Sequence, residues 1–374
     1  MNGERHICFV ANQGQHYRLP IFREMDEELD CHFYLGDRLE TPIKPFKYTI
    51  LTGYKKTLRN HYFGHFYWQS GALSVVWEKY DAYIFTGEPF CLSTWLILLL
   101  LKLRRVQTVS WTHGWYGREG KIKTWVKKTY FSLFTDIWVY GNYAIGLMAE
   151  AGISRTKMRC IANSLDSRTN QHIRQGLTPQ DVYKEHFGNN LPVVIYCGRI
   201  QRVKKLDMLI DSLALLKESG HAVNLIVIGE DVEGVGLETY ARNKGVKENV
   251  WFYGPCYDDE QLATFFYNAH VCVSPGNIGL TAIHAMSFGC PAITHGNFAH
   301  QMPEFEAIRP GVTGDFFKED DVKDLAVVIR RWTAMTAEKR EEVRQAAFEE
   351  IDRKWNVGYQ MDIIQQTLKI AKER

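Results

Sequence analysis

Short apolar runs recur along the chain, separated by longer segments in which apolar residues follow helical spacing. Runs of three to five residues with almost no polar position are typical of strands buried on both faces, and their alternation with helices predicts parallel sheets covered by helices. The predicted strands span residues 6–10, 31–35, 82–86, 106–110, 137–140, 193–197, 225–229, 250–253, 271–274 and 292–294.

These strands fall into two groups, separated by a polar stretch without periodicity at residues 167–190. A chain of 374 residues also exceeds the about 250–300 residues at which single cores usually divide. We therefore predict two Rossmann-like, doubly wound α/β domains at residues 1–166 and 191–355, joined by a linker at 167–190. Residues 356–374 are predicted to form a C-terminal helix with an apolar stripe of Ile363, Ile364, Leu368 and Ile370.

The most apolar stretch, residues 89–101, is shorter than the roughly 20 residues that a membrane-spanning helix needs, so it predicts a buried helix. The first strand begins without the longer apolar region of a signal peptide. Eight scattered cysteines without metal spacing indicate reduced core residues. These features predict a cytoplasmic protein. A net charge of +2 gives no indication of nucleic-acid binding.

Basic residues follow the predicted strand 193–197. Gly198 and Arg199 come directly after it, and Lys204 and Lys205 precede an amphipathic helical segment. Ligands of open parallel sheets bind beyond the carboxyl ends of strands, where these cations would meet an anion such as phosphate. A solvated basic helix start is the alternative.

A glycine-containing loop follows the predicted strand 271–274. Gly276 and Gly279 lie in this loop, and a short helical run at 282–288 comes next. A strand, a glycine loop and a helix start together present backbone N–H groups at the positive end of a helix, which favours a diphosphate. A tight connection is the alternative, but two anion-binding ends in one domain favour a nucleotide site.

From residue 198 onward these features follow the order of one known family. The matching segments are Gly198-Arg199-Ile200 with Lys204 (a GR(L/I)…K phosphate motif), 225–229, 249–254 (a nucleotide-base segment), 274–291 (a donor loop and helix) and 311–314. In the first half, residues 163–166 are similar to an NGVD signature, and His113-Gly114 resembles a histidine near the transferred sugar. The chain thus resembles the GT4-like group of GT-B glycosyltransferases, many of which build bacterial surface polysaccharides.

The resemblance implies a retaining, metal-independent enzyme with two domains facing across a cleft and a last helix that returns to the first domain. It implies a nucleotide-diphospho-sugar donor, no cofactor, and a glycan or lipid-linked acceptor. The residues it places at the reaction centre are Arg199, Lys204, His113 and Glu304. The residues it places around the donor are Gly198, Pro255, Cys256, Gly276, Asn277, Gly279, Leu280, Thr281 and His284.

Two departures from the family pattern change the expected chemistry. The family has glutamates eight positions apart across the donor loop and helix, where this chain has Gly276 and His284. The loss at Gly276 suggests a donor sugar that is substituted or deoxygenated at the contacted position, or one that is held instead by Asn277, His113 or Glu304. His284 is expected either to hydrogen-bond the ribose or simply to line the helix. No DxD motif is found for a divalent ion, which leaves charge stabilisation to Arg199 and Lys204.

In the first domain, a polar glycine turn follows the first strand. Gly14, Gln15 and His16 in this turn are candidates to bind acceptor hydroxyls, although such turns often only connect a strand to a helix. His113 follows another strand between Trp111 and Trp115, whose rings could pack on a sugar.

Residues 115–134 combine aromatic and basic side chains. This pattern is typical of an interfacial helix that touches anionic lipid, with a domain helix and a wet basic face as the alternative. The basic residues are Arg118, Lys121, Lys123, Lys127 and Lys128, and the aromatic ones are Trp115, Tyr116, Trp125, Tyr130, Phe131 and Phe134.

The leading interpretation is a glycosyltransferase of surface-polysaccharide synthesis. Two alternatives remain open at this point. One is a nucleotide-sugar epimerase of the same fold, which would need several carboxylates in its site, and the missing glutamates count against it. The other is a protein that binds sugar nucleotides without catalysis.

Overall fold

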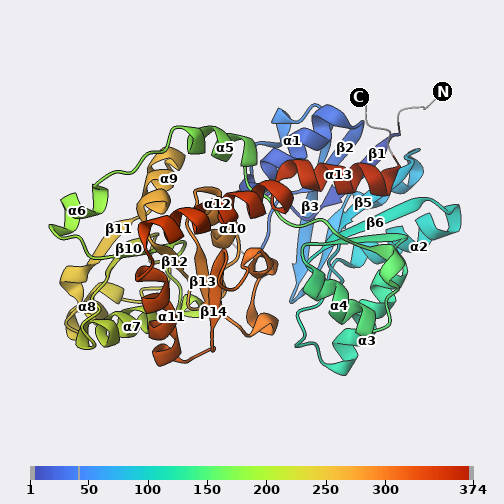
Figure 1. Cartoon of the computed structure of the whole chain (residues 1–374). Coiled ribbons are helices and arrows are strands. Elements are labelled where there is room, and N and C mark those ends of the chain that lie inside the picture. The colour runs from blue at the N-terminus through green and yellow to red at the C-terminus, as the bar shows by residue number, and fades with distance from the viewer. Residues whose placement is uncertain (1–4, 41–42, 370–374) are drawn as a thin grey trace. The chain divides into compact units, whose positions relative to one another are not determined.

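The computed structural model describes residues 5–40 and 43–369, and the chain divides into two compact units. Unit 1 comprises Met1–Leu165 together with Val357–Arg374, and unit 2 comprises Asp166–Asn356. Each unit contains one sheet flanked by helices (Figure 1).

Unit 1 is built on an eight-stranded sheet with the order β4-β3-β2-β1-β5-β6-β7-β8. All neighbouring strands are parallel except β3 and β4. Residues alternate between the two faces, so Phe9 packs under α1 and α13, while Val10 packs under α2, α3 and α4. The strands are β1 (Ile7–Ala11), β2 (Cys31–Gly36), β3 (Tyr54–Phe63), β4 (Phe66–Ser70), β5 (Ala82–Thr86), β6 (Gln107–Thr112), β7 (Asp136–Val139) and β8 (Met158–Cys160), and the helices are α1 (Leu19–Glu28), α2 (Leu92–Arg104), α3 (Lys121–Ser132), α4 (Asn142–Glu150) and α13 (Val357–Leu368).

Unit 2 is built on a six-stranded, fully parallel sheet with the order β11-β10-β9-β12-β13-β14. Helices α7, α8 and α11 contribute to the core on one face, and α6, α9 and α10 to the core on the other. The strands are β9 (Val193–Cys197), β10 (Asn224–Ile228), β11 (Val250–Gly254), β12 (Val271–Val273), β13 (Ala292–His295) and β14 (Gly314–Phe317), and the helices are α5 (Ser167–Gln175), α6 (Val182–Phe187), α7 (Leu206–Glu218), α8 (Leu237–Asn243), α9 (Asp259–Asn268), α10 (Thr281–Ser287), α11 (Val322–Thr333) and α12 (Ala337–Lys354).

The ten predicted strands are all present, but four others were missed. β3 and β4 form an antiparallel pair, with β4 at the sheet edge, and five of the ten residues of β3 are exposed. With polar residues on both faces, β3 lacks the apolar run used as the signal. β8 and β14 have only 3 and 4 residues.

The prediction of an irregular linker at 167–190 is wrong, because this stretch contains α5 and α6. Asp166 caps α5 by accepting a hydrogen bond from the backbone N–H of Thr169 at 3.1 Å. The hydroxyl of Tyr183 on α6 is buried and donates to the carbonyl of Phe265 on α9 at 2.6 Å. Both helices therefore pack within unit 2. Their few apolar positions concealed them in the sequence.

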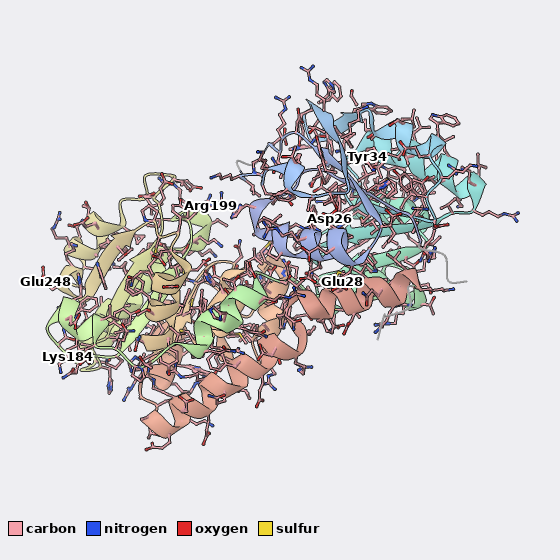
Figure 2. All side chains as sticks on the ribbon, turned by 90° about the horizontal axis from the view of Figure 1, so that it is seen from above. Asp26, Glu28, Tyr34, Lys184, Arg199 and Glu248 are labelled. Carbon is pink, nitrogen blue, oxygen red and sulfur yellow. The ribbon has the colours of Figure 1, made fainter. Side chains whose placement is uncertain are left out.

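The last helix packs on unit 1, as predicted. Ile364 and Leu368 of α13 are fully buried in the core that also holds Phe9. The amide of Gln365 donates to Glu28 on α1 at 2.9 Å, and Figure 2 shows Glu28 beside this helix. Ile370 of the predicted apolar stripe lies outside the described residues.

The prediction that residues 89–101 form a buried helix is only half right. One face of α2 packs in the core through Ile97, Leu98 and Leu101. Its other face carries a row of exposed leucines: Leu92, Leu96, Leu99 and Leu103 are 41%, 40%, 50% and 83% exposed. Among the described residues, no helix is both long and apolar enough to cross a bilayer.

We predict that Ile364→Ala destabilises unit 1 by about 2–5 kcal/mol, the usual effect of removing a buried aliphatic side chain. The measurement is urea unfolding followed by circular dichroism. Gln366→Ala, at an exposed position of the same helix, is the control and should change stability by less than about 0.5 kcal/mol. Equal stability of the two variants would show that α13 does not contribute to the core.

Candidate functional site

The strand order of unit 2 reverses between β9 and β12, which are neighbours in the sheet. In open α/β sheets, ligands bind beyond the carboxyl ends of the strands at such a reversal. The segments that follow these two strands are those singled out from the sequence, 198–205 and 274–281. Figure 2 shows Arg199 at this end of unit 2, with Lys184 and Glu248 at the opposite end.

The turn after β9 brings two backbones into contact. The N–H of Gly198 donates to the carbonyl of Ile228, and a Cβ atom at Gly229 would lie 1.9 Å from the carbonyl oxygen of Gly198. Gly198 has a φ of +149° and Gly229 of +154°, both outside the range that other residues favour. The hydroxyl of Tyr196 donates to the carbonyl of Arg199 at 2.8 Å and fixes this turn, while Arg199 itself is exposed.

Lys204 joins the two segments. Its Nζ donates to the backbone carbonyl of Asn277 at 2.6 Å and to the Oδ1 atom of Asn277 at 2.7 Å. Burial and the charge of the nearby Arg199 lower the pKa of Lys204 to about 8, while Glu304 acts in the opposite direction. A buried ammonium with a lowered pKa in such a position is a candidate to bind an anion.

Gly276 has a structural role that the sequence did not reveal. Its N–H donates to the carbonyl of Lys204 at 3.0 Å, and its carbonyl accepts a hydrogen bond from Thr294 Oγ1 at 2.8 Å. A Cβ atom at this position would lie 2.1 Å from the carbonyl oxygen of Val203. The absence of a side chain is therefore required by the approach of the 198–205 segment, and we correct the view that Gly276 only signals a change of donor sugar.

The next turn of the loop presents backbone donors. Within the described residues, hydrogen-bond acceptors are found for the N–H groups of Gly276 and Ile278, but none for those of Gly279, Leu280 and Thr281. Three N–H groups ahead of α10 are positioned to bind phosphate oxygens. The hydroxyl of Thr281 donates to the carbonyl of Cys197 at 3.0 Å, which ties the start of α10 to the end of β9.

Two buried side chains that sequence reasoning missed hold this loop from behind. The Oε1 atom of Gln301 accepts from the N–H of Ile278 at 3.1 Å, and its amide group donates to Thr294 Oγ1 at 2.8 Å. Thr294 in turn donates to the carbonyls of Ser274 and Gly276. Neither residue belongs to a recognisable motif, so no sequence signal marked them.

The two remaining candidates near this loop are buried. Glu304, in the 3-10 helix Pro303–Ala307, is 2% exposed and lies close enough to Lys204 to raise its pKa. The ring of His284 packs against Phe266 and Phe288 at centroid distances of 5.2 and 5.4 Å, and burial lowers its pKa to about 4. His284 is thus a neutral imidazole, and its packing gives weight to the helix-lining alternative.

The segment after β11 lies at the same end of the sheet. Pro255 is exposed and Cys256 half-buried, and Cys256 lies near enough to Cys197 to contribute to the raised pKa of that thiol. A contact with a nucleotide base remains a prediction for these two residues. In the described part of the chain, His, Cys, Asp and Glu residues form no group placed to hold a metal ion.

The turn after β1 in unit 1 is rigid. The N–H of Gly14 donates to the hydroxyl of Tyr48, so it is not available to bind a ligand. The carbonyl of Gly14 accepts a hydrogen bond from the N–H of Phe46. The N–H of His16 donates to the carbonyl of Lys44. Gln15 differs from both: it is 6% exposed, and its Oε1 atom has no hydrogen-bond partner among the described residues.

His113 follows β6 and lies against two tyrosines. Its ring centroid is 4.8 Å from that of Tyr140 and 6.2 Å from that of Tyr116. Burial lowers the pKa of His113 to about 4, so it is neutral at physiological pH. The expectation that Trp111 and Trp115 flank a sugar is wrong, because they are only 2% and 4% exposed and pack in the core.

The prediction that residues 115–134 form an interfacial helix touching anionic lipid also needs correction. Lys127 is 7% exposed and donates to the carbonyl of Gly114 at 2.6 Å and to Glu119 at 2.8 Å. Tyr130, Phe131 and Phe134 are core residues, as is Trp115. Of the aromatic residues, Trp125 is the clearly exposed one at 67%.

The match to a known sequence family lies within unit 2. Residues 179–350 match the family described as glycosyl transferases group 1. The putative glycosyltransferase EpsD of Bacillus subtilis (strain 168) is 30% identical over 151 residues, which are 40% of this chain and 37% of EpsD. Mannosylfructose-phosphate synthase of Agrobacterium fabrum is 26% identical over 198 residues, which are 50% of this chain and 42% of that protein. The matches thus span less than half of these relatives.

Solved structures match the whole chain. Anabaena HepE in complex with UDP has a TM-score of 0.72 at 16% identity, and covers 98% of this chain and 100% of its own. The lipopolysaccharide outer core galactosyltransferase WaaB, in its apo form, has a TM-score of 0.71 at 14% identity with the same coverage. These likenesses confirm the predicted GT-B fold.

We predict that Gly276→Ala destabilises unit 2 by about 1–3 kcal/mol or more, because the added methyl group overlaps the Val203 carbonyl. Gly296→Ala is the matched control, since a Cβ atom there would lie 3.6 Å from Phe316 in ordinary contact. Thermal unfolding measures both, with roughly 2–4 °C expected per kcal/mol. Equal melting temperatures would contradict the role assigned to Gly276.

Proposed function

We propose that this protein transfers a sugar from a nucleotide-diphospho-sugar to an acceptor, because residues 179–350 match the family described as glycosyl transferases group 1 and the chain has the GT-B fold. The observation that carries this proposal is the joining of the two segments at the β9 and β12 reversal by Lys204. The acceptor is a glycan or lipid-linked glycan, and the product a cell-surface polysaccharide.

The donor diphosphate is bound in unit 2 by groups of complementary charge. Arg199 supplies an exposed forked donor, and Lys204 a buried ammonium. The N–H groups of Gly279, Leu280 and Thr281 supply further donors from the backbone. UDP is the nucleotide named with Anabaena HepE, and a uridine nucleotide is therefore the first donor to test here.

The transfer proceeds with retention and without a metal ion. The bond between the sugar C1 and the leaving diphosphate breaks, and the acceptor hydroxyl forms a new C1–O bond on the same face. The proton of that hydroxyl passes to an oxygen of the leaving diphosphate, which needs no protein carboxylate. What the protein supplies is positive charge and placement, from Arg199, Lys204 and the backbone donors.

Other candidates take supporting roles. Neutral His113 accepts or donates one hydrogen bond to the transferred sugar. Glu304 maintains the charge of Lys204, whose pKa it raises. Since no side chain fits at position 276, Asn277 is the residue of this loop that holds donor hydroxyls.

We propose that the row of exposed leucines on α2 and the start of α3 rest on an anionic bilayer, where the enzyme would reach a lipid-linked acceptor. Trp95 on α2 packs against Tyr130 on α3 at 5.0 Å, so the two helices adjoin. Ile122 and Trp125 of α3 are 82% and 67% exposed. Exposed lysines and arginines lie on these two helices or just before α3: Lys102, Arg118, Lys121, Lys123 and Lys128.

We predict that Lys204→Met lowers turnover on the order of a hundredfold, the scale expected when one preorganised charge is removed. Lys205→Met is the matched control, because Lys205 pairs with Asp320 and should leave turnover close to that of the wild type. The assay measures transfer and slow donor hydrolysis across a panel of nucleotide sugars. Wild-type binding without either reaction would favour the non-catalytic alternative, and conversion of the donor to its epimer would favour the epimerase.

The pH dependence of donor binding gives an independent test. Lys204 is protonated below its pKa of about 8 and loses its charge above it, so the Kd for the nucleotide should rise at higher pH, by at most about tenfold per unit. Calorimetric titrations between pH 6.5 and 9.5 measure this dependence. Lys204→Met should bind weakly and without the bend near pH 8, and a bend that persists in this variant would contradict the assignment.

For the membrane surface, we predict sedimentation with anionic phosphatidylglycerol vesicles at low salt and loss of binding in Leu99→Glu. The glutamate removes apolar area and adds repulsion from the lipid charge. Val327→Glu in unit 2 is the control, because Val327 is likewise an exposed apolar residue, at 63%. A wild-type chain that stays in the supernatant, or equal binding of both variants, would contradict the proposal.

A further inference from the structure

Buried polar atoms without partners gather after β1 in unit 1. Gln13, Gln15 and Arg18 are 3%, 6% and 8% exposed. Among the described residues, no hydrogen-bond partner exists for the Oε1 atoms of both glutamines, for Nη2 of Arg18 or for the indole Nε1 of Trp111. Nearly all buried polar groups in folded proteins are paired, so four such atoms together indicate a missing ligand. We call these four residues the Arg18 cluster.

Contacts hold the members of the cluster in two pairs. The guanidinium carbon of Arg18 lies 4.4 Å from the ring centroid of Trp111, which is at the end of β6. The Oδ1 atom of Asn12 accepts from the backbone N–H of Gln13 at 2.8 Å and from the side-chain amide of Gln15 at 3.4 Å. Asn12 therefore holds the backbone of Gln13 and the side chain of Gln15, and the Oε1 atoms of both glutamines remain available as acceptors.

Arg18 carries a buried positive charge that the described residues do not pair. Neither a hydrogen bond nor a salt bridge is formed by its guanidinium within that part of the chain. Glu88 is near enough to interact with Arg18 electrostatically, but its two oxygens accept from Asn12 and Tyr67, each at 2.9 Å. A buried cation without a bonded anion is costly, and a ligand anion would remove that cost.

Contacts with aromatic rings do not give Arg18 a hydrogen-bond acceptor. Its guanidinium carbon lies 5.0 and 4.4 Å from the ring centroids of Phe22 and Trp111. Arginine carries its N–H donors in a planar fork, and Nη2 has no acceptor among the described residues. A forked contact with phosphate or carboxylate would use these donors.

The cluster also lies where a ligand of this sheet is expected. The strand order of unit 1 reverses between β1 and β5, and the cluster follows β1 directly. We propose that the Arg18 cluster binds the acceptor through an anionic substituent, a phosphate or a carboxylate, whose neighbouring hydroxyls donate to Gln13 and Gln15. This assignment rests on the proposed transferase function, for which it names the acceptor class as an anionic sugar.

Calorimetry with glucose, glucose 6-phosphate, glucuronate and inorganic phosphate tests the assignment on the full chain. The wild type should bind at least one anionic sugar ten or more times more tightly than glucose. Arg18→Met, which keeps an apolar side chain against the rings, should abolish that preference. Arg23→Met, at an exposed position on α1, is the control and should retain it.

Several outcomes would overturn the proposal. They are a wild type without anion preference, a preference that survives in Arg18→Met, or inorganic phosphate that binds as tightly as the sugar phosphate. Thermal unfolding distinguishes a ligand-binding role of Arg18 from a structural role, because removing an unpaired buried cation should leave the melting temperature unchanged or raise it. A marked fall in the melting temperature of Arg18→Met together with unaltered sugar binding would assign Arg18 to the core instead.

The proposed function is tested separately by donor hydrolysis without acceptor, measured on the wild-type chain. Hydrolysis with no anion preference would leave the transferase in place and remove the acceptor assignment. An anion preference with neither hydrolysis nor transfer would remove the transferase and leave a binding site for anionic sugars.

Discussion

The contact between the 198–205 segment and the loop before α10 is the constraint on which the rest of unit 2 depends. The Lys204 ammonium and the Gly276 backbone form it together, and the backbone of residue 203 leaves no room for a side chain at position 276. The contact places a partly desolvated cation next to a row of backbone donors.

Both units place polar residues where the strand order of the sheet reverses, but the polar groups differ between the two units. In each sheet, the strand order reverses next to the strand whose following segment carries the polar residues, β9 in unit 2 and β1 in unit 1. In the site proposed for unit 2, the polar groups are backbone N–H groups and Lys204. Unit 1 instead holds amide oxygens and the guanidinium of Arg18, which lies against the ring of Trp111. These groups suit a ligand with both hydroxyls and an anion.

The sequence was sufficient for features that depend on local pattern. Buried strands such as β9 follow from apolar runs, and the position of Gly198 and Lys204 at the carboxyl end of the sheet follows from their place after a strand. Features that depend on partners far along the chain could not be read in this way. The steric need for Gly276 requires the position of Val203, and burial of Lys127 requires Glu119. Helices α5 and α6 were missed because they bury few apolar side chains.

Hydrogen–deuterium exchange with and without a bound nucleotide sugar tests the central claim most directly, since it reports on backbone N–H groups themselves. Ligand binding should slow exchange in two segments of unit 2, residues 198–205 and 276–284, with the largest effect at Gly279, Leu280 and Thr281, which have no acceptor among the described residues. Protection confined to other strands of either sheet, or no protection at these three positions despite saturating ligand, would contradict a diphosphate site at the β9 and β12 reversal.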